Sequence, residues 1–141
     1  MDKLTLLQDW YRRVWIEGDL DAVDEYFAPQ SGAEGLMPDG QVTAEDFRAL
    51  VPALRMVVRD LRIEIDRHVE CDDWLWVHVT AHAVKATGIE PVSASGQVMV
   101  RVADGRFVEV YNSFDFITFF EQLGLLPAGA FLLLLAGERI G

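Results

Sequence analysis

The sequence has one cysteine, few basic residues and no long apolar run among its 141 residues. Because Cys71 is alone, an internal disulfide is excluded, and so is a zinc site built from several thiolates. Basic residues number 12 against 23 acidic ones, and the formal charge of −11 disfavours binding to nucleic acid or to an anionic membrane surface. The apolar run at 128–137 is shorter than the roughly 20 residues that a bilayer requires. The first residues lack a signal-peptide pattern, so we expect a cytoplasmic protein.

What the sequence does contain predicts a single domain over residues 1–141, which includes an apolar C-terminal tail at 128–141. Hydrophobic residues make up 51% and charged residues 25% of the chain, as in ordinary globular domains. Apolar residues at intervals of three and four predict a helix over 4–16, with Asp2 as its N-cap. Two further helices are predicted over 19–27 and 43–56. In the second of these, Thr43 and Asp46 are expected to form a capping box, and Pro52 is expected to cause a kink or an early end. The segment 29–42 is expected to be a loop.

The second half of the chain has the two-residue periodicity of strands. Alternating residues predict strands over 61–70, 74–87, 92–102 and 106–114, with a tight hairpin turn at Asp104-Gly105 and a final helix over 117–123. Helices followed by hairpin-connected antiparallel strands predict an α+β fold in which the helices cover one face of a curved sheet. A strongly curved sheet that helices close on its concave side forms a cone, and the interior of such a cone is suited to a small hydrophobic molecule.

Several motifs occur in an order that matches a known family. The first motif is Trp15-Ile-Glu-Gly-Asp-Leu-Asp-Ala-Val-Asp-Glu-Tyr-Phe-Ala-Pro. The next two are Asp60-Leu-Arg-Ile-Glu-Ile and Thr80-Ala-His. The most distinctive stretch is Asp104-Gly-Arg-Phe-Val-Glu-Val-Tyr, followed by Asp115 and Gln122-Leu-Gly-Leu-Leu-Pro. Over residues 10–127 these motifs resemble the SnoaL-like polyketide cyclases of the nuclear transport factor 2-like (NTF2-like) superfamily. The resemblance implies a cone-shaped, cystatin-like fold, and the superfamily includes both enzymes and binding modules.

Asp115 is the leading candidate for chemistry. It stands among aromatic residues where a strand becomes a helix, and apolar surroundings raise the pKa of a carboxylate toward the range of a general base. The resemblance places the cyclases' general base at this position. Asp115 is equally well placed to cap the helix that follows, which would lower its pKa instead. Both interpretations remain open.

His82 and Trp76 lie on one face of the strand over 74–87, and this face either lines the cone or forms a dimer surface. If this face lines the cone, the resemblance implies that His82 forms a hydrogen bond with a substrate oxygen. Tyr111, four residues before Asp115, is expected either to wall the pocket or to be a core aromatic whose hydroxyl is hydrogen-bonded. Glu109 is expected to form a structural ion pair on the sheet with a partner such as Arg101. The helices and the loop supply further candidate walls, which are Trp15, Tyr11, Met37 and Leu54.

The sequence therefore predicts a small-molecule enzyme of polyketide or ester cyclase type that uses neither a cofactor nor a metal. Asp115 would abstract a proton alpha to a carbonyl, and His82 with Tyr111 would steady the enolate oxygen. One alternative is a non-catalytic module that binds a ligand or forms a dimer, and a second is an isomerase of the ketosteroid isomerase type. The expected partners are a small hydrophobic molecule and a second copy of the chain.

Overall fold

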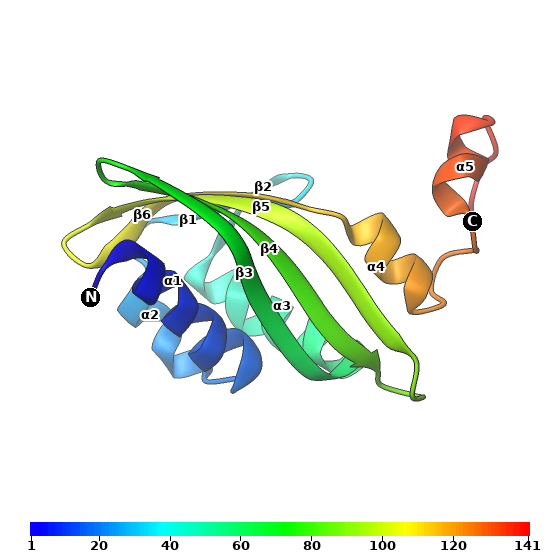
Figure 1. Cartoon of the computed structure of the whole chain (residues 1–141), viewed down its shortest axis with the longest axis horizontal. Coiled ribbons are helices and arrows are strands. Elements are labelled where there is room, and N and C mark those ends of the chain that lie inside the picture. The colour runs from blue at the N-terminus through cyan, green and yellow to red at the C-terminus, as the bar shows by residue number, and fades with distance from the viewer.

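The computed structural model describes residues 1–141 and shows helices packed against one face of a six-stranded sheet (Figure 1). The helical elements are α1 (Lys3–Trp10), the π-helix η1 (Tyr11–Ile16), the 3-10 turn η2 (Leu20–Ala22), α2 (Val23–Tyr26), α3 (Ala44–Val57), α4 (Phe116–Gln122) and α5 (Ala130–Leu135). The strands are β1 (Gly32–Met37), β2 (Gly40–Thr43), β3 (Val58–Cys71), β4 (Trp74–Lys85), β5 (Pro91–Ala103) and β6 (Arg106–Phe114).

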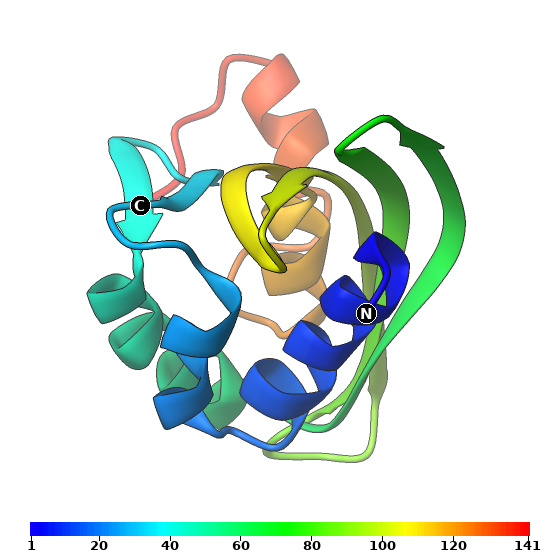
Figure 2. The same ribbon diagram turned by 90° about the vertical axis from the view of Figure 1, so that its left-hand side faces the viewer.

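The sheet has the strand order β2-β1-β6-β5-β4-β3. Strands β3 to β6 pair as successive antiparallel neighbours, whereas β1 joins β6 in parallel. Figure 2 shows the sheet curving around α1, α2 and α3. The predicted α+β fold, with a curved sheet around N-terminal helices, is confirmed.

The helix caps predicted at Asp2 and Thr43 are present. The Asp2 carboxylate accepts a hydrogen bond from the Thr5 N–H at 2.7 Å and begins α1. At the start of α3, the Asp46 carboxylate accepts from the Thr43 N–H at 2.9 Å, and the Thr43 hydroxyl accepts from the Asp46 N–H at 3.3 Å. Pro52 lies inside α3, which continues to Val57, so the early end that we considered does not occur.

The expected loop over 29–42 is wrong, because most of this segment forms β1 and β2. Its sequence is poor in β-branched residues, and part of the pairing that holds it is non-local: β1 and β2 pair with each other, but Ala33 also pairs with Val110 and Glu34 with Tyr111 of β6. Gly35, at φ +89, lets β1 pass so close to β6 that a Cβ there would lie 1.8 Å from the Asn112 carbonyl oxygen. Local sequence patterns do not report a strand that depends on such a distant partner.

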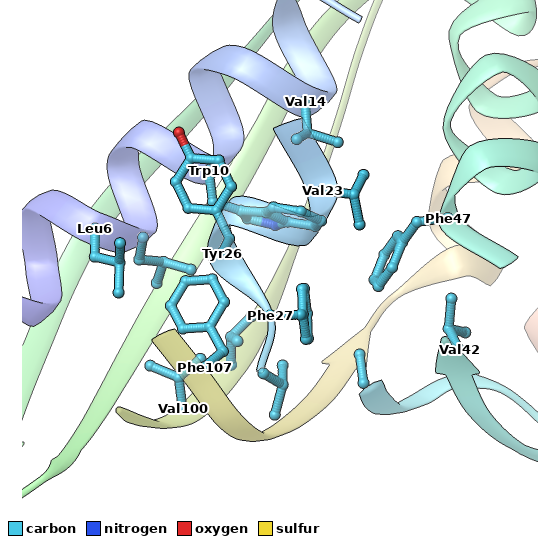
Figure 3. Packing of buried hydrophobic residues seen from close by; sticks show 14 of the residues in the cluster. Leu6, Trp10, Val14, Val23, Tyr26, Phe27, Val42, Phe47, Val100 and Phe107 are labelled. Atoms are coloured by element: carbon cyan, nitrogen blue, oxygen red, sulfur yellow. The ribbon is translucent and has the colours of Figure 1, made fainter. Parts of the chain in front are cut away.

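The main hydrophobic core lies between the helices and the inner face of the sheet, and Trp10 is at its centre (Figure 3). The centroids of the Phe27 and Phe47 rings each lie 5.1 Å from that of Trp10, edge to face, and Phe107 of β6 packs beneath. We call the sheet face that meets this core the inner face. The opposite one, which carries Trp74 and the other even-numbered residues of β4, is the outer face.

The C-terminal tail contains the short helix α5, which stands apart from the other helices (Figure 1). It packs mainly against α4, and the Glu121 carboxylate accepts a hydrogen bond from the Gly129 N–H at 3.0 Å just before it begins. None of the helices combines the length and the hydrophobicity that a membrane crossing requires.

Candidate functional site

A cavity of about 130 Å³ lies between the helices and the inner face of the sheet. Of its 24 lining residues, 21 are hydrophobic, and they come from α1, η1, α3, α4 and five of the six strands. None of them is an aspartate, glutamate, histidine, lysine or arginine. The cavity therefore offers almost no acid or base, and its few polar groups determine what it can bind.

The π-helix η1 brings two aromatic side chains, Tyr11 and Trp15, to the cavity. A π-helix is wider than an α-helix and is often found at functional sites. Burial raises the pKa of Tyr11 well above its usual range, so the phenol stays protonated and can act only as a hydrogen-bond donor or acceptor. Its hydroxyl makes no hydrogen bond to another group of the chain.

Asn112 supplies the second polar group on the inner face. It lies opposite Val98 of β5 and alternates with Val110 and Phe114, which also line the cavity. Its side-chain amide, like the Tyr11 hydroxyl, has no partner within the protein. Our sequence analysis missed Asn112; the available signal was that Asn112 is the one amide on the face of its strand that also carries Val110 and Phe114.

Asp115 lies outside the lining, at the N-cap of α4. Its exposed carboxylate accepts hydrogen bonds from the Thr118 hydroxyl at 2.6 Å and from the Thr118 N–H at 3.0 Å. These two bonds hold the pKa of Asp115 below its ordinary value, which agrees with the helix cap and not with the raised pKa of a general base. The cap that we considered as the alternative is present.

His82 and Trp76 lie on the outer face of the sheet rather than in the cavity. The inward positions of β4 are taken by Leu75, Val77 and their odd-numbered neighbours, so the even-numbered residues point away from the helices. His82 Nε2 lies 3.1 Å from a Glu64 carboxylate oxygen. The Trp76 indole N–H donates to a Gln97 side-chain oxygen at 3.0 Å.

Among the other predicted wall residues, Tyr11, Trp15 and Leu54 line the cavity. Tyr111 does not, because it points outward and stacks on Trp74 with ring centroids 6.3 Å apart. Met37 is an exposed residue at the end of β1, also outside the lining. The structure thus brings together the helical part of the predicted site and leaves the predicted strand residues on the opposite face.

Comparisons with known proteins give a consistent picture. The family model described as SnoaL-like domain matches residues 7–110. TsrD from Streptomyces laurentii is 21% identical with a TM-score of 0.70, over 89% of this chain and 99% of that one. A SnoaL-like polyketide cyclase from Agrobacterium tumefaciens is 14% identical with a TM-score of 0.67, over 88% of this chain and 100% of that one. A third structure is a protein with a ketosteroid isomerase-like fold from Catenulispora acidiphila, in complex with trimethylamine. It is 13% identical with a TM-score of 0.72, over 88% of this chain and 95% of that one. Among curated proteins, no sequence match was found.

Proposed function

This chain belongs to the SnoaL-like domain family, and from that premise we propose that it binds a small, mostly apolar molecule carrying one oxygen-bearing group. The observation that carries the proposal is that two polar side chains at inward positions, Tyr11 and Asn112, have no hydrogen-bond partner within the chain. The other polar lining residues, Gln97 and Ser113, occupy outward positions of β5 and β6. Pockets for small ligands typically combine apolar walls with a few polar groups that fix the ligand's orientation.

The energetics of the two polar groups favour a ligand oxygen. Neither the Tyr11 hydroxyl nor the Asn112 amide is a fully buried group without a partner, so a ligand that bonds to one of them replaces water there, and each such hydrogen bond contributes about 0.5–1.5 kcal/mol. The Tyr11 hydroxyl is protonated at neutral pH and can donate to a carbonyl, while the Asn112 amide can both donate and accept. A ketone, an ester or an alcohol satisfies these groups, whereas a carboxylate meets no cation among the lining residues.

The volume of the cavity limits the size of the ligand. At about 130 Å³ it is close to the roughly 150 Å³ of a dry protein cavity that accepts benzene. A molecule with one ring or a short branched chain therefore fits without rearrangement.

Binding of cyclohexanone, followed by isothermal titration calorimetry, tests the proposal. We expect Tyr11→Phe to weaken binding by about 3–10-fold, since one hydrogen bond contributes about 0.5–1.5 kcal/mol, and methylcyclohexane to bind both proteins equally. Tyr111→Phe is the matched control, because it removes a tyrosine hydroxyl on the outer face. Equal losses from the two substitutions would refute the role given to Tyr11, and a lack of saturable binding to the unaltered protein would refute the proposal.

Cyclase or isomerase chemistry with Asp115 as general base is a second candidate, and one observation favours it. Asp115 lies between Phe114 and Phe116, which both line the cavity; to act as a base, its carboxylate would have to leave Thr118 and rotate toward the cavity. Enzyme-dependent deuterium exchange at the alpha carbons of cyclohexanone, measured by NMR, would support this candidate if Asp115→Asn abolished it. Under the binding proposal, neither protein accelerates the exchange.

A further inference from the structure

A hollow of about 330 Å³ lies on the outer face of the sheet, near the turn that joins β4 to β5. It contains a row of three polar residues on neighbouring strands: Arg62 of β3 pairs with His82 of β4, and His82 pairs with Ser93 of β5. The Cβ atoms of directly opposite residues lie about 4.5–5.5 Å apart, so these three side chains border the same small space. Pockets for small ligands start at about 300 Å³, so the hollow has room for one.

The exposed guanidinium of Arg62 has no carboxylate partner within the chain. Two acidic residues flank it along β3, but both are held by other groups: Asp60 contacts Arg59 at 2.9 Å, and Glu64 contacts the His82 ring at 3.1 Å. Acidic residues outnumber basic ones by 23 to 12, so an arginine without a carboxylate is unexpected here. Five other arginines form ion pairs, namely Arg12, Arg13, Arg48, Arg59 and Arg101. Arg62 is therefore free to bind an anion from outside the chain.

An apolar row lies beside the polar row on the same face. Val84 of β4 pairs with Pro91 of β5, and both residues line the hollow. Each stands two positions along its strand from His82 or Ser93, which corresponds to about 7 Å. An anion bound at Arg62 could therefore extend a short apolar body over Val84 and Pro91.

We propose that this hollow binds a short-chain monocarboxylate. Its carboxylate bonds to Arg62 and Ser93, and its aliphatic part lies on Val84 and Pro91. A guanidinium presents two parallel N–H donors that match the two oxygens of a carboxylate. The backbone of Ser93 is fixed by the Gln122 amide, which accepts from its N–H at 2.8 Å and donates to its carbonyl at 2.7 Å. The Ser93 hydroxyl forms no bond within the chain and is free to donate to the ligand.

The charges around the hollow allow an anion to bind although the net charge of the chain is −11. Asp60 also lines the hollow, but the Arg59 guanidinium beside it offsets its charge. Acidic groups farther than about 10 Å away are screened by salt. Glu64 occupies Nε2 of His82 and leaves Nδ1 without a partner, so the protonated ring can donate to the ligand as well. The site lies outside the cavity and does not depend on the proposed function.

Titration of the full chain with sodium butyrate at constant ionic strength and about pH 6, followed by the NMR signals of the histidine rings, tests the proposal. The signals of His82 are assigned by their absence from His82→Gln. We expect them to shift saturably with a dissociation constant of about 1–10 mM. Butyrate should bind about 3–10-fold more tightly than acetate, because its longer chain covers Val84 and Pro91. Arg62→Gln should weaken the binding of both by at least about 10-fold, since hydrogen bonds between charged groups are strong.

Arg67→Gln is the matched control, because Arg67 is exposed on the same strand, pairs with His78 and forms no ion pair. It removes the same charge outside the hollow, so the affinity for butyrate should change by less than about twofold. Val84→Thr is a second test, and it should reduce the preference for butyrate while leaving acetate binding unchanged. Arg62 is exposed and Val84 only half-buried, so both variants should stay folded, which circular dichroism verifies.

Four results would overturn the proposal. The first is the lack of a saturable shift of the His82 signals up to about 100 mM butyrate. The second is an equal loss of affinity in Arg62→Gln and Arg67→Gln, which would show that anions are attracted without a defined site. The third is equal affinity for acetate and butyrate, which would remove the apolar part of the ligand. The fourth is tighter binding of inorganic phosphate than of butyrate, which would assign the hollow to a phosphate group instead.

Discussion

Replacing Asp115 tests whether its carboxylate serves as a helix cap. The two hydrogen bonds from Thr118 satisfy the first turn of α4, and an N-cap replaced by alanine costs about 1 kcal/mol of unfolding free energy. Because Asp115 is exposed, solvent screening leaves the hydrogen bonds rather than the charge as the main contribution. Asparagine caps helices almost as well, so at pH 7 we expect Asp115→Ala to lose about 1 kcal/mol and Asp115→Asn less than half of that.

The effect of pH follows from the direction of the pKa shift. The pKa of Asp115 in the folded protein is lowered from 3.8, so its ionised form is favoured by folding. Such a carboxylate contributes stability above its unfolded pKa, and the contribution disappears as the pH falls through the folded pKa. The free energy of unfolding that Asp115→Asn loses relative to the unaltered protein should therefore be largest above about pH 5. This loss should become smaller as the pH falls below 3.8.

Urea unfolding followed by tryptophan fluorescence measures both effects. If the free energy falls with a slope of about 2 kcal/mol per molar urea, a loss of 1 kcal/mol lowers the midpoint by roughly 0.5 M. Asp21→Asn is the control, since Asp21 is an exposed residue of η2 whose side chain makes no hydrogen bond or ion pair. An unchanged midpoint for Asp115→Ala at pH 7 would refute the cap, and so would a deficit of Asp115→Asn that is equally large at pH 3.

Three further substitutions test the framework around the cavity. Thr43→Ala should lower the free energy of unfolding by about 1 kcal/mol, because it removes one half of the capping box of α3, and urea unfolding checks this. Gly35→Ala should cost more than about 2 kcal/mol, since its Cβ would collide with the Asn112 carbonyl; a melting temperature equal to that of the unaltered protein would contradict the close approach of β1 and β6. Phe107→Ala should cost about 3–5 kcal/mol, because Phe107 is 1% exposed and packs against Trp10, Tyr26 and Phe27, and calorimetry measures the loss.

Features determined by neighbouring residues were predictable from the sequence. The caps of α1 and α3 lie where the pattern predicted them, and the turn between β5 and β6 has positive φ at Asp104 and Gly105. The ion pair between Arg101 and Glu109 also forms, with nitrogen and oxygen 3.2 Å apart. Each depends on residues close in sequence or across one hairpin, so local rules are sufficient.

The orientation of the strands toward the cavity was not predictable in the same way. A two-residue period shows that Trp76 and His82 share a face, but in β4 both faces carry large apolar residues, so the period does not show which face meets the helices. For the same reason Tyr111 was expected in the cavity, whereas Asn112 is the residue that lines it. Strand β1 pairs with the distant β6, which no local pattern reports, and β2 pairs with β1 alone.

The wide turn of η1 sets the rotational phase of the first helix. Its hydrogen bonds span five residues, as from the Glu17 N–H to the Arg12 carbonyl at 2.9 Å, so the segment holds more residues per turn than an α-helix. Removing one residue there would restore a regular helix and turn the preceding residues by about 100°. The position of the Tyr11 hydroxyl at the cavity thus depends on the number of residues between Asp2 and Gly18. A relative with one residue fewer would offer a different side chain from the same fold.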